Sequence, residues 1–200
     1  MDAGIPVLFR SYQSQETHSG CKIWEAARAT SAAPTFFKHI EIGNKQPFID
    51  GGLGCNNPSK LVLKEAQVVF PTHQIGCLVS IGAGQAEVIS IGVPGFFQQI
   101  VPTHILDALK GISTDCERMH EDISLLFANS SNTYFRINVE QGMQDIKHSE
   151  WEKMANVEAH TIQYLRKKEV GEKLTLVISA IKSPKAQLMI EQFGINYFVI

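Results

Sequence analysis

The pattern of apolar and polar residues is clearest after residue 56, where a helix signal is followed by a strand signal. Asn57 is a natural N-cap and Pro58 suits a first helical position. Residues at helical spacing follow, namely Leu61, Val62, Glu65, Ala66 and Val69. The run Cys77–Ile81 is continuously apolar and closes at Gly82-Ala83-Gly84, as a strand buried on both faces of a parallel sheet does. Helix, strand and glycine turn in succession predict an α/β fold.

The residues before position 50 carry shorter signals. They predict a strand at Val7–Arg10, an alanine-rich helix at Ile23–Ala33 that ends before Pro34, an extended or irregular segment at Thr35–Ile42, a turn at Gly43-Asn44, and a strand at Gln46–Ile49. The residues after position 84 carry mostly helical signals. They predict a loop at Ile89–Pro102, a long helix from about His104 to Ala128, a strand at Thr133–Val139 and an amphipathic helix at Glu150–Lys168. The run Leu174–Ile181 fits a strand or a buried helix equally well.

Composition narrows the class of protein. With 200 residues and 44% hydrophobic composition, the chain can bury the core of one domain. A net charge of -2 argues against a nucleic-acid-binding protein, which would carry a basic stripe. Four widely spaced cysteines without a C-x-x-C pair predict reduced thiols in an intracellular compartment. No secretory signal and no apolar run of about 20 residues is present, so we expect a soluble, cytoplasmic protein that makes at most peripheral contact with membranes or lipid droplets.

The first candidate for chemistry is Asp50, which a strand-like segment delivers to the pair Gly51-Gly52. Glycine reaches positive φ without a Cβ penalty, so we expect a sharp turn that leaves the carboxylate pointing into a cleft. An Asp-Gly pair is also ordinary hairpin chemistry, and the motif alone does not decide between these uses.

Three blocks together resemble the patatin-like phospholipase family. They are Phe9-Arg10-Ser11-Tyr12, the run Ile23-Trp24-Glu25-Ala26-Ala27-Arg28-Ala29-Thr30-Ser31-Ala32-Ala33-Pro34-Thr35-Phe36-Phe37, and Asp50-Gly51-Gly52 leading to Asn57-Pro58. The resemblance implies a three-layer α/β/α patatin-like fold, here N-terminally truncated, with a mostly helical C-terminal part. It assigns residues 1–66 to the C-terminal portion of the phospholipase domain and residues 67–200 to a strand-and-helix region that continues the fold.

Members of this family hydrolyse acyl esters of lipids with a serine and an aspartate. Asp50 matches the aspartate, so the resemblance makes Asp50 the proton acceptor, with Gly51 and Gly52 completing its motif. It implies a lipid or acyl-ester substrate, no cofactor and no metal. A carboxylate can take the proton of a serine hydroxyl only from within hydrogen-bond reach.

The serine of that pair is missing from the sequence. No Gly-x-Ser-x-Gly occurs among the 200 residues, and the nearest approach, Gly111-Ile112-Ser113-Thr114-Asp115, lacks the last glycine and follows Asp50. We therefore expect either a truncated hydrolase, whose nucleophile lies upstream, or a catalytically inactive remnant that acts as an interaction protein.

Other residues have simpler interpretations. Arg28 fits a pair with Glu25 or a cap on a neighbouring loop, and Gly82-Ala83-Gly84 fits a strand-end turn better than a dinucleotide fingerprint. Cys116 and His120 are spaced like metal ligands but lack a second pair, so we expect an ordinary helix surface. The apolar loop Ile91–Phe97 fits a segment packed on the core, or less readily a lipid contact.

Overall fold

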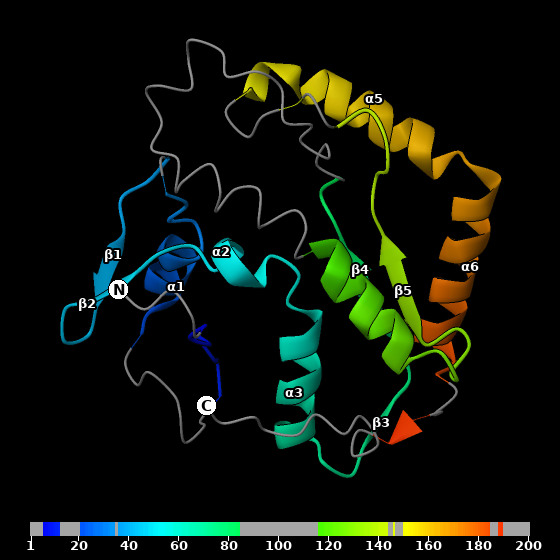
Figure 1. The fold of residues 1–200 in the computed structure, drawn as a ribbon, viewed down its shortest axis with the longest axis horizontal. Helices are drawn as coiled ribbons and strands as arrows, with labels where there is room; N and C mark the ends of the chain where they lie inside the picture. The colour runs from blue at the N-terminus through cyan, green and yellow to red at the C-terminus, as the bar shows by residue number, and fades with distance from the viewer. Residues whose placement is uncertain are drawn as a thin grey trace. The chain divides into compact units, whose positions relative to one another are not determined.

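Both helices and strands occur along the chain in the computed structural model, which confirms the predicted mixed α/β class (Figure 1). The structure describes residues 6–12, 21–34, 36–84, 116–143, 146, 150–184 and 188–189. These residues fall into two units. The first holds the described residues up to Asn56 together with Cys116, and the second holds the others.

The first unit is a short helix packed on a hairpin. Helix α1 (Ile23–Ala29) lies against strands β1 (Ile40–Ile42) and β2 (Gln46–Phe48), which pair antiparallel. The predicted turn between the strands is confirmed, and Gly43 adopts a φ of +63° there. Helix α2 (Gly52–Cys55) follows β2. Buried side chains of α1 and the hairpin form the core of this unit, namely Ala29, Ile42 and Phe48.

Two predictions for the first unit are wrong. The alanine-rich helix ends at Ala29 rather than Ala33, because the hydroxyls of Thr30 and Ser31 both donate to the carbonyl of Ala27 and compete with further helical bonds. Residues 7–10 form no strand. Instead the ring of Phe9 packs on that of Phe48, with the ring centroids 5.3 Å apart.

The second unit is built on a parallel strand pair. Strands β4 (Leu78–Ile81) and β5 (Tyr134–Ile137) pair in parallel, as the apolar run predicted. Helix α3 (Ser59–Val69) precedes them, and β3 (Gln74–Ile75) pairs antiparallel with β6 (Leu188–Met189). Burial of β4 on both faces was predicted as well, but Ile81 is 76% exposed.

Helices pack on both faces of the β4–β5 pair. On one face Leu78 and Tyr134 contact a core cluster of Leu63, Ile123 and Phe127, which come from α3 and from the helical residues 116–126 with their following turn. On the other face Ile137 contacts Tyr164 and Val170, which belong to α5 (Met154–Leu165) and α6 (Lys168–Lys182). Figure 1 shows α6 running alongside β5. The alternation of side chains along β5 therefore supplies apolar groups to two helical layers.

The helices after residue 150 differ in part from the prediction. The expected Glu150–Lys168 helix is a 3-10 turn, η2 (Trp151–Lys153), followed by α5. Trp151 is 75% exposed and Met154 is 62% exposed, so neither anchors that helix in the core. The run Leu174–Ile181 is helical within α6, although Ile181 is 62% exposed and the helix is amphipathic rather than buried.

Some predictions concern residues outside the described ranges. They are the loops Ile89–Pro102 and Ile91–Phe97 and the first part of the helix expected from His104, and with it the segment 111–115. Within the part of the chain that the structure describes, no helix is both long enough and apolar enough to cross a bilayer.

Candidate functional site

Asp50 occupies a tight turn between β2 and α2. Its backbone N–H donates to the carbonyl of Ala32 at 3.1 Å, which ties the turn to the segment that follows α1. Its Oδ1 accepts the N–H of Gly52 at 2.7 Å. The carboxylate is therefore fixed through one oxygen, while Oδ2 has no hydrogen bond to any described residue. Such a carboxylate keeps an acceptor in place for a further partner.

The two glycines act differently from the prediction, which relied on positive φ. Gly51 is in the right-handed helical region with φ of −65°, and Gly52 is also absent from the positive-φ residues of the described chain. A Cβ added at Gly52 would stand 3.1 Å from Asp50 Oδ1, whereas one added at Gly51 would meet nothing within 4 Å. Gly52 is therefore needed for the close approach of the Asp50 carboxylate.

This difference predicts opposite results for two alanine variants. Gly52→Ala is expected to cost about 0.5–1.5 kcal/mol of unfolding free energy, because the added Cβ pushes Asp50 Oδ1 from its hydrogen bond. Gly51→Ala is expected to be neutral or to stabilise by up to about 1 kcal/mol through the unfolded chain. Urea unfolding of both variants measures the difference, and equal destabilisation would contradict this assignment of the two glycines.

The Asn-Pro segment after the motif opens a polar network in the second unit. Helix α3 begins at Ser59, one residue later than predicted, and Asn57 Oδ1 accepts both the N–H of Ser59 at 3.3 Å and its hydroxyl at 2.7 Å. The hydroxyl of Ser80 in β4 also donates to Asn57 Oδ1, at 3.4 Å. Ser80 in turn accepts a hydrogen bond from Arg136 Nη1 at 3.0 Å. The network thus links the start of α3 to both parallel strands.

The glycine turn after β4 belongs to the same network. Asn138 Oδ1 accepts the N–H of Gly84, where φ is +116°. A Cβ at Gly82 would contact Asn138 Oδ1 and lie 2.6 Å from Arg136 Nη2. Gly84 is therefore required for its positive φ, and Gly82 is required for the close approach of the Asn138 and Arg136 side chains. The predicted strand-end turn is confirmed.

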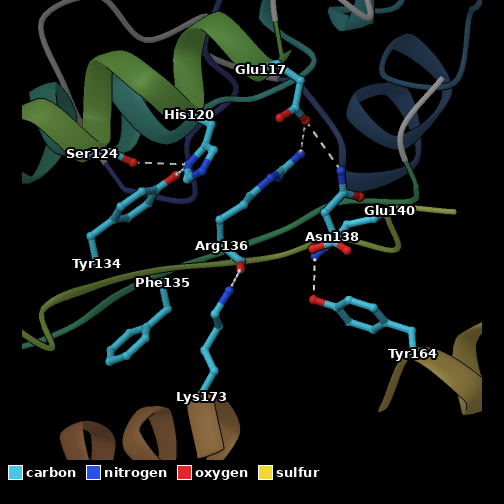
Figure 2. A pocket seen from close by; sticks show the side chains of 10 residues that line it. All are labelled: Glu117, His120, Ser124, Tyr134, Phe135, Arg136, Asn138, Glu140, Tyr164 and Lys173. Atoms are coloured by element: carbon cyan, nitrogen blue, oxygen red, sulfur yellow. Dashed lines mark hydrogen bonds and ion pairs between the residues drawn. The ribbon is translucent and has the colours of Figure 1, made fainter. Parts of the chain in front are cut away.

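A cavity of about 250 Å³ lies beside β5 in the second unit (Figure 2). Its walls come from the helical residues 116–126, from β5 and the residues after it, and from α5 and α6. The lining residues are Glu117, His120, Ser124, Tyr134, Phe135, Arg136, Asn138, Glu140, Tyr164 and Lys173. We call this space the β5 cavity. Its walls are mostly polar or charged, so it suits a polar ligand or part of one.

The sequence predicted that His120 lies on an ordinary helix surface, but the structure places it in the wall of the β5 cavity. Its Nδ1 lies 3.0 Å from Tyr134 Oη and 3.3 Å from Ser124 Oγ. Burial lowers the pKa of His120 from its ordinary value of 6.5, and Arg136 and Lys173 add to this, against Glu117 and Glu121, which raise it. Burial likewise raises the pKa of the Tyr134 hydroxyl. The Nδ1 of a neutral imidazole can accept a hydrogen bond from the Tyr134 hydroxyl, which ties the helix to β5.

The lowered pKa predicts acid sensitivity. Because the folded state binds the His120 proton less tightly than the unfolded state, stability is full above pH 6.5 and declines as the pH falls from there through the folded-state pKa. His120→Gln, which does not titrate, is expected to show a smaller loss of unfolding free energy between about pH 7 and pH 5. A His120→Gln slope equal to that of the wild type would contradict the prediction.

Side chains also form hydrogen bonds with backbone groups on the edge of β5 that faces away from β4. Leu78 and Gly82 donate to the carbonyls of Thr133 and Ile137, so the alternate residues of β5 present their backbone groups to the other edge. There Lys173 Nζ donates to the carbonyl of Arg136 at 3.4 Å, and the N–H of Asn138 donates to Tyr164 Oη at 3.4 Å. Figure 2 shows Tyr164 and Lys173 extending toward the strand from α5 and α6. Nothing in the spacing of Tyr164 or Lys173 signalled these contacts.

The remaining candidates have structural roles. Arg28 donates from Nη2 to the carbonyl of Lys38 at 2.6 Å and lies over the ring of Phe37, which confirms the loop cap rather than a pair with Glu25. None of the four cysteines forms a disulfide bond. Among the described residues no group of three or more His, Cys, Asp or Glu side chains could hold a metal ion.

Comparison with known proteins identifies relatives of the chain. Residues 7–63 match the family model described as patatin-like phospholipase. The chain is 33% identical over 185 residues to calcium-independent phospholipase A2-gamma of Rattus norvegicus, covering 88% of this chain and 23% of that protein. It is 30% identical over 175 residues to the protein of that name from Homo sapiens, covering 84% and 21%.

A bacterial protein is also similar. The cGAMP-activated phospholipase of Vibrio cholerae is 41% identical over 112 residues, which cover 52% of this chain and 29% of that protein. No solved structure is a significant match to the chain. The chain spans only about a quarter of the length of the mammalian relatives it matches.

Proposed function

This chain belongs to the patatin-like phospholipase family, and we propose that it forms part of an enzyme that hydrolyses acyl esters of lipids. The observation that carries the proposal is the Asp50 turn. It falls within the residues that match the family model, and its carboxylate is fixed by a backbone N–H. A general base has to be held in position before its substrate arrives, because an ill-placed carboxylate loses most of its effect.

In this proposal Asp50 is the proton acceptor of a Ser-Asp pair. Oδ1 stays bound to the Gly52 N–H, and Oδ2 takes the proton from the serine hydroxyl as that oxygen attacks the ester carbonyl. The hydroxyl thereby becomes an acyl ester and the alcohol portion of the lipid leaves with a proton. Water then releases the fatty acid by the same exchange of protons in reverse.

We further propose that the nucleophile lies in polypeptide outside these 200 residues. The sequence contains no Gly-x-Ser-x-Gly. The matched relatives are about four times longer than the part that aligns with this chain, so they have room for such a segment. The remnant hypothesis predicts instead that no polypeptide containing this chain hydrolyses lipid esters.

The proposal extends to the surroundings of the site. The substrate would be a phospholipid or a related acyl ester, met by peripheral contact with a membrane or a lipid droplet. The lack of disulfide bonds among the four cysteines favours the cytoplasm. Helices on both faces of β4 and β5 support, within the second unit, the three-layer α/β/α arrangement that the family resemblance implies.

Fatty-acid release tests the proposal. The 200-residue chain and an extended polypeptide that also carries a Gly-x-Ser-x-Gly segment from the same gene would be incubated with phosphatidylcholine vesicles. We expect release by the extended polypeptide and none by the 200-residue chain. If the 200-residue chain releases fatty acid and its Asp50→Asn variant releases it equally well, both the Ser-Asp hypothesis and the remnant hypothesis are wrong.

A further inference from the structure

The guanidinium of Arg136 in the β5 cavity is incompletely paired by the residues around it. Arg136 is 89% buried as a side chain, since 11% of its surface is exposed, yet its Nη2 lies 3.9 Å from Glu117 Oε1. That distance exceeds a charge-assisted hydrogen bond, which is about 2.7–2.9 Å. The Nε of Arg136 is buried and has no hydrogen-bond partner among the described residues. A buried donor left unpaired is costly, so the guanidinium retains capacity for an additional acceptor.

The balance of charge in the β5 cavity favours an anion. Glu140 is already bound by Lys167, whose Nζ lies 3.2 Å from its Oε2. Lys173 contacts the carbonyl of Arg136 and makes no ion pair within the described part of the chain. Among the residues that line the β5 cavity, Glu117 is therefore the one carboxylate left to balance the cations of Arg136 and Lys173.

Glu117 holds this position loosely. It accepts a hydrogen bond from Asn138 Nδ2 at 3.4 Å, and 38% of its side chain is exposed. Figure 2 shows its carboxylate above Arg136 and Asn138, at the upper edge of the group of side chains. An exposed carboxylate in such weak contacts can turn into water at little cost, because surface pairs contribute at most about 1 kcal/mol.

We propose that the β5 cavity binds a phosphate group, which replaces the Glu117 carboxylate between Arg136, Asn138 and Lys173. A guanidinium fork matches two oxygens of a phosphate, and the lysine supplies a second cation. The Nδ2 of Asn138, which donates to Glu117 Oε1 at 3.4 Å, supplies a neutral donor once Glu117 is displaced. The volume of about 250 Å³ is several times the roughly 30 Å³ that one water occupies, so a tetrahedral anion fits. The proposal rests on residues of the second unit alone and does not depend on the proposed hydrolysis.

Calorimetric titration of the 200-residue chain tests the proposal, with inorganic phosphate as the first probe and sodium chloride of equal ionic strength as the blank. The decisive variant is Glu117→Gln, which removes the competing charge and keeps the side-chain shape. It is expected to tighten phosphate binding by up to about fivefold. Lys173→Gln is expected to weaken binding by a similar factor. Lys168→Gln, whose side chain is 91% exposed on the same helix as Lys173, is the matched control and should leave binding unchanged.

Arg136→Gln should abolish phosphate binding. Because this substitution also removes the hydrogen bond to Ser80, the variant could unfold, and the Glu117 and Lys173 variants then decide the test. A second titration uses a short-chain phosphatidic acid below its micelle concentration. Binding of both probes would identify a lipid phosphate as an acceptable source, and binding of inorganic phosphate alone would identify the free ion. Weaker binding in Glu117→Gln, or no phosphate binding by either the wild type or that variant, would overturn the proposal. Loss of lipid hydrolysis alone would bear on Asp50 and leave this site untouched.

Discussion

Asp50→Asn in the extended polypeptide is expected to lower kcat for lipid ester hydrolysis by about 10²- to 10⁴-fold, the range that a positioned general base contributes. The amide cannot take a proton from a serine hydroxyl. It can still accept the Gly52 N–H through its oxygen, so the turn should persist and the loss should lie in kcat rather than in folding.

A matched substitution controls for the loss of one negative charge. Asp122 is exposed on the helical residues 116–126, so Asp122→Asn is expected to leave kcat unchanged. Stability of both variants is measured by urea unfolding alongside fatty-acid release. An Asp50→Asn enzyme that folds and retains wild-type kcat would remove Asp50 from the mechanism.

Ile123→Ala is expected to destabilise the 200-residue chain by about 2–5 kcal/mol, the largest stability effect we predict. Ile123 is fully buried and lies in a core cluster with Leu63 of α3 and Phe127. Truncation leaves a cavity between α3, the helical residues 116–126 and the strand face of Leu78 and Tyr134. Closely packed interiors relax only in part around such a gap, so the cost exceeds the lost transfer free energy.

Leu125 tests whether position rather than residue type causes this effect. It lies two residues further along the helix and is 75% exposed, so Leu125→Ala is expected to change stability by less than about 0.5 kcal/mol. Equal losses in the two variants, measured as urea midpoints with unchanged slopes, would mean that this helix does not pack on the β4–β5 pair as described.

Three elements of the fold were predicted correctly from neighbouring residues. The apolar run before Gly82 predicted a parallel strand, and β4 pairs in parallel with β5. The turn at Gly43 and the helix after Pro58 also follow from neighbouring residues. The end of α1 was placed four residues too late, because the hydroxyls of Thr30 and Ser31 decide it and alanine content does not reveal them.

Of the two candidate sites, the Asp50 turn could be predicted from the sequence and the β5 cavity could not. Asp50 could be singled out because its motif lies within consecutive residues, although the reason for Gly52 is a close contact rather than positive φ. The β5 cavity could not be predicted, because it joins Glu117, Arg136 and Lys173 from three separate elements. Their convergence follows from strand pairing and helix packing, which residue spacing does not encode.

Labelling with a serine-directed fluorophosphonate tests the central claim most directly, because it reports the activated nucleophile without turnover or product release. The account predicts that one serine of the extended polypeptide is modified, within a Gly-x-Ser-x-Gly sequence. It also predicts that Asp50→Asn slows this modification by about 10²-fold or more while Asp122→Asn does not. Modification at an unchanged rate in Asp50→Asn, or no modified serine in the wild-type polypeptide, would contradict the account.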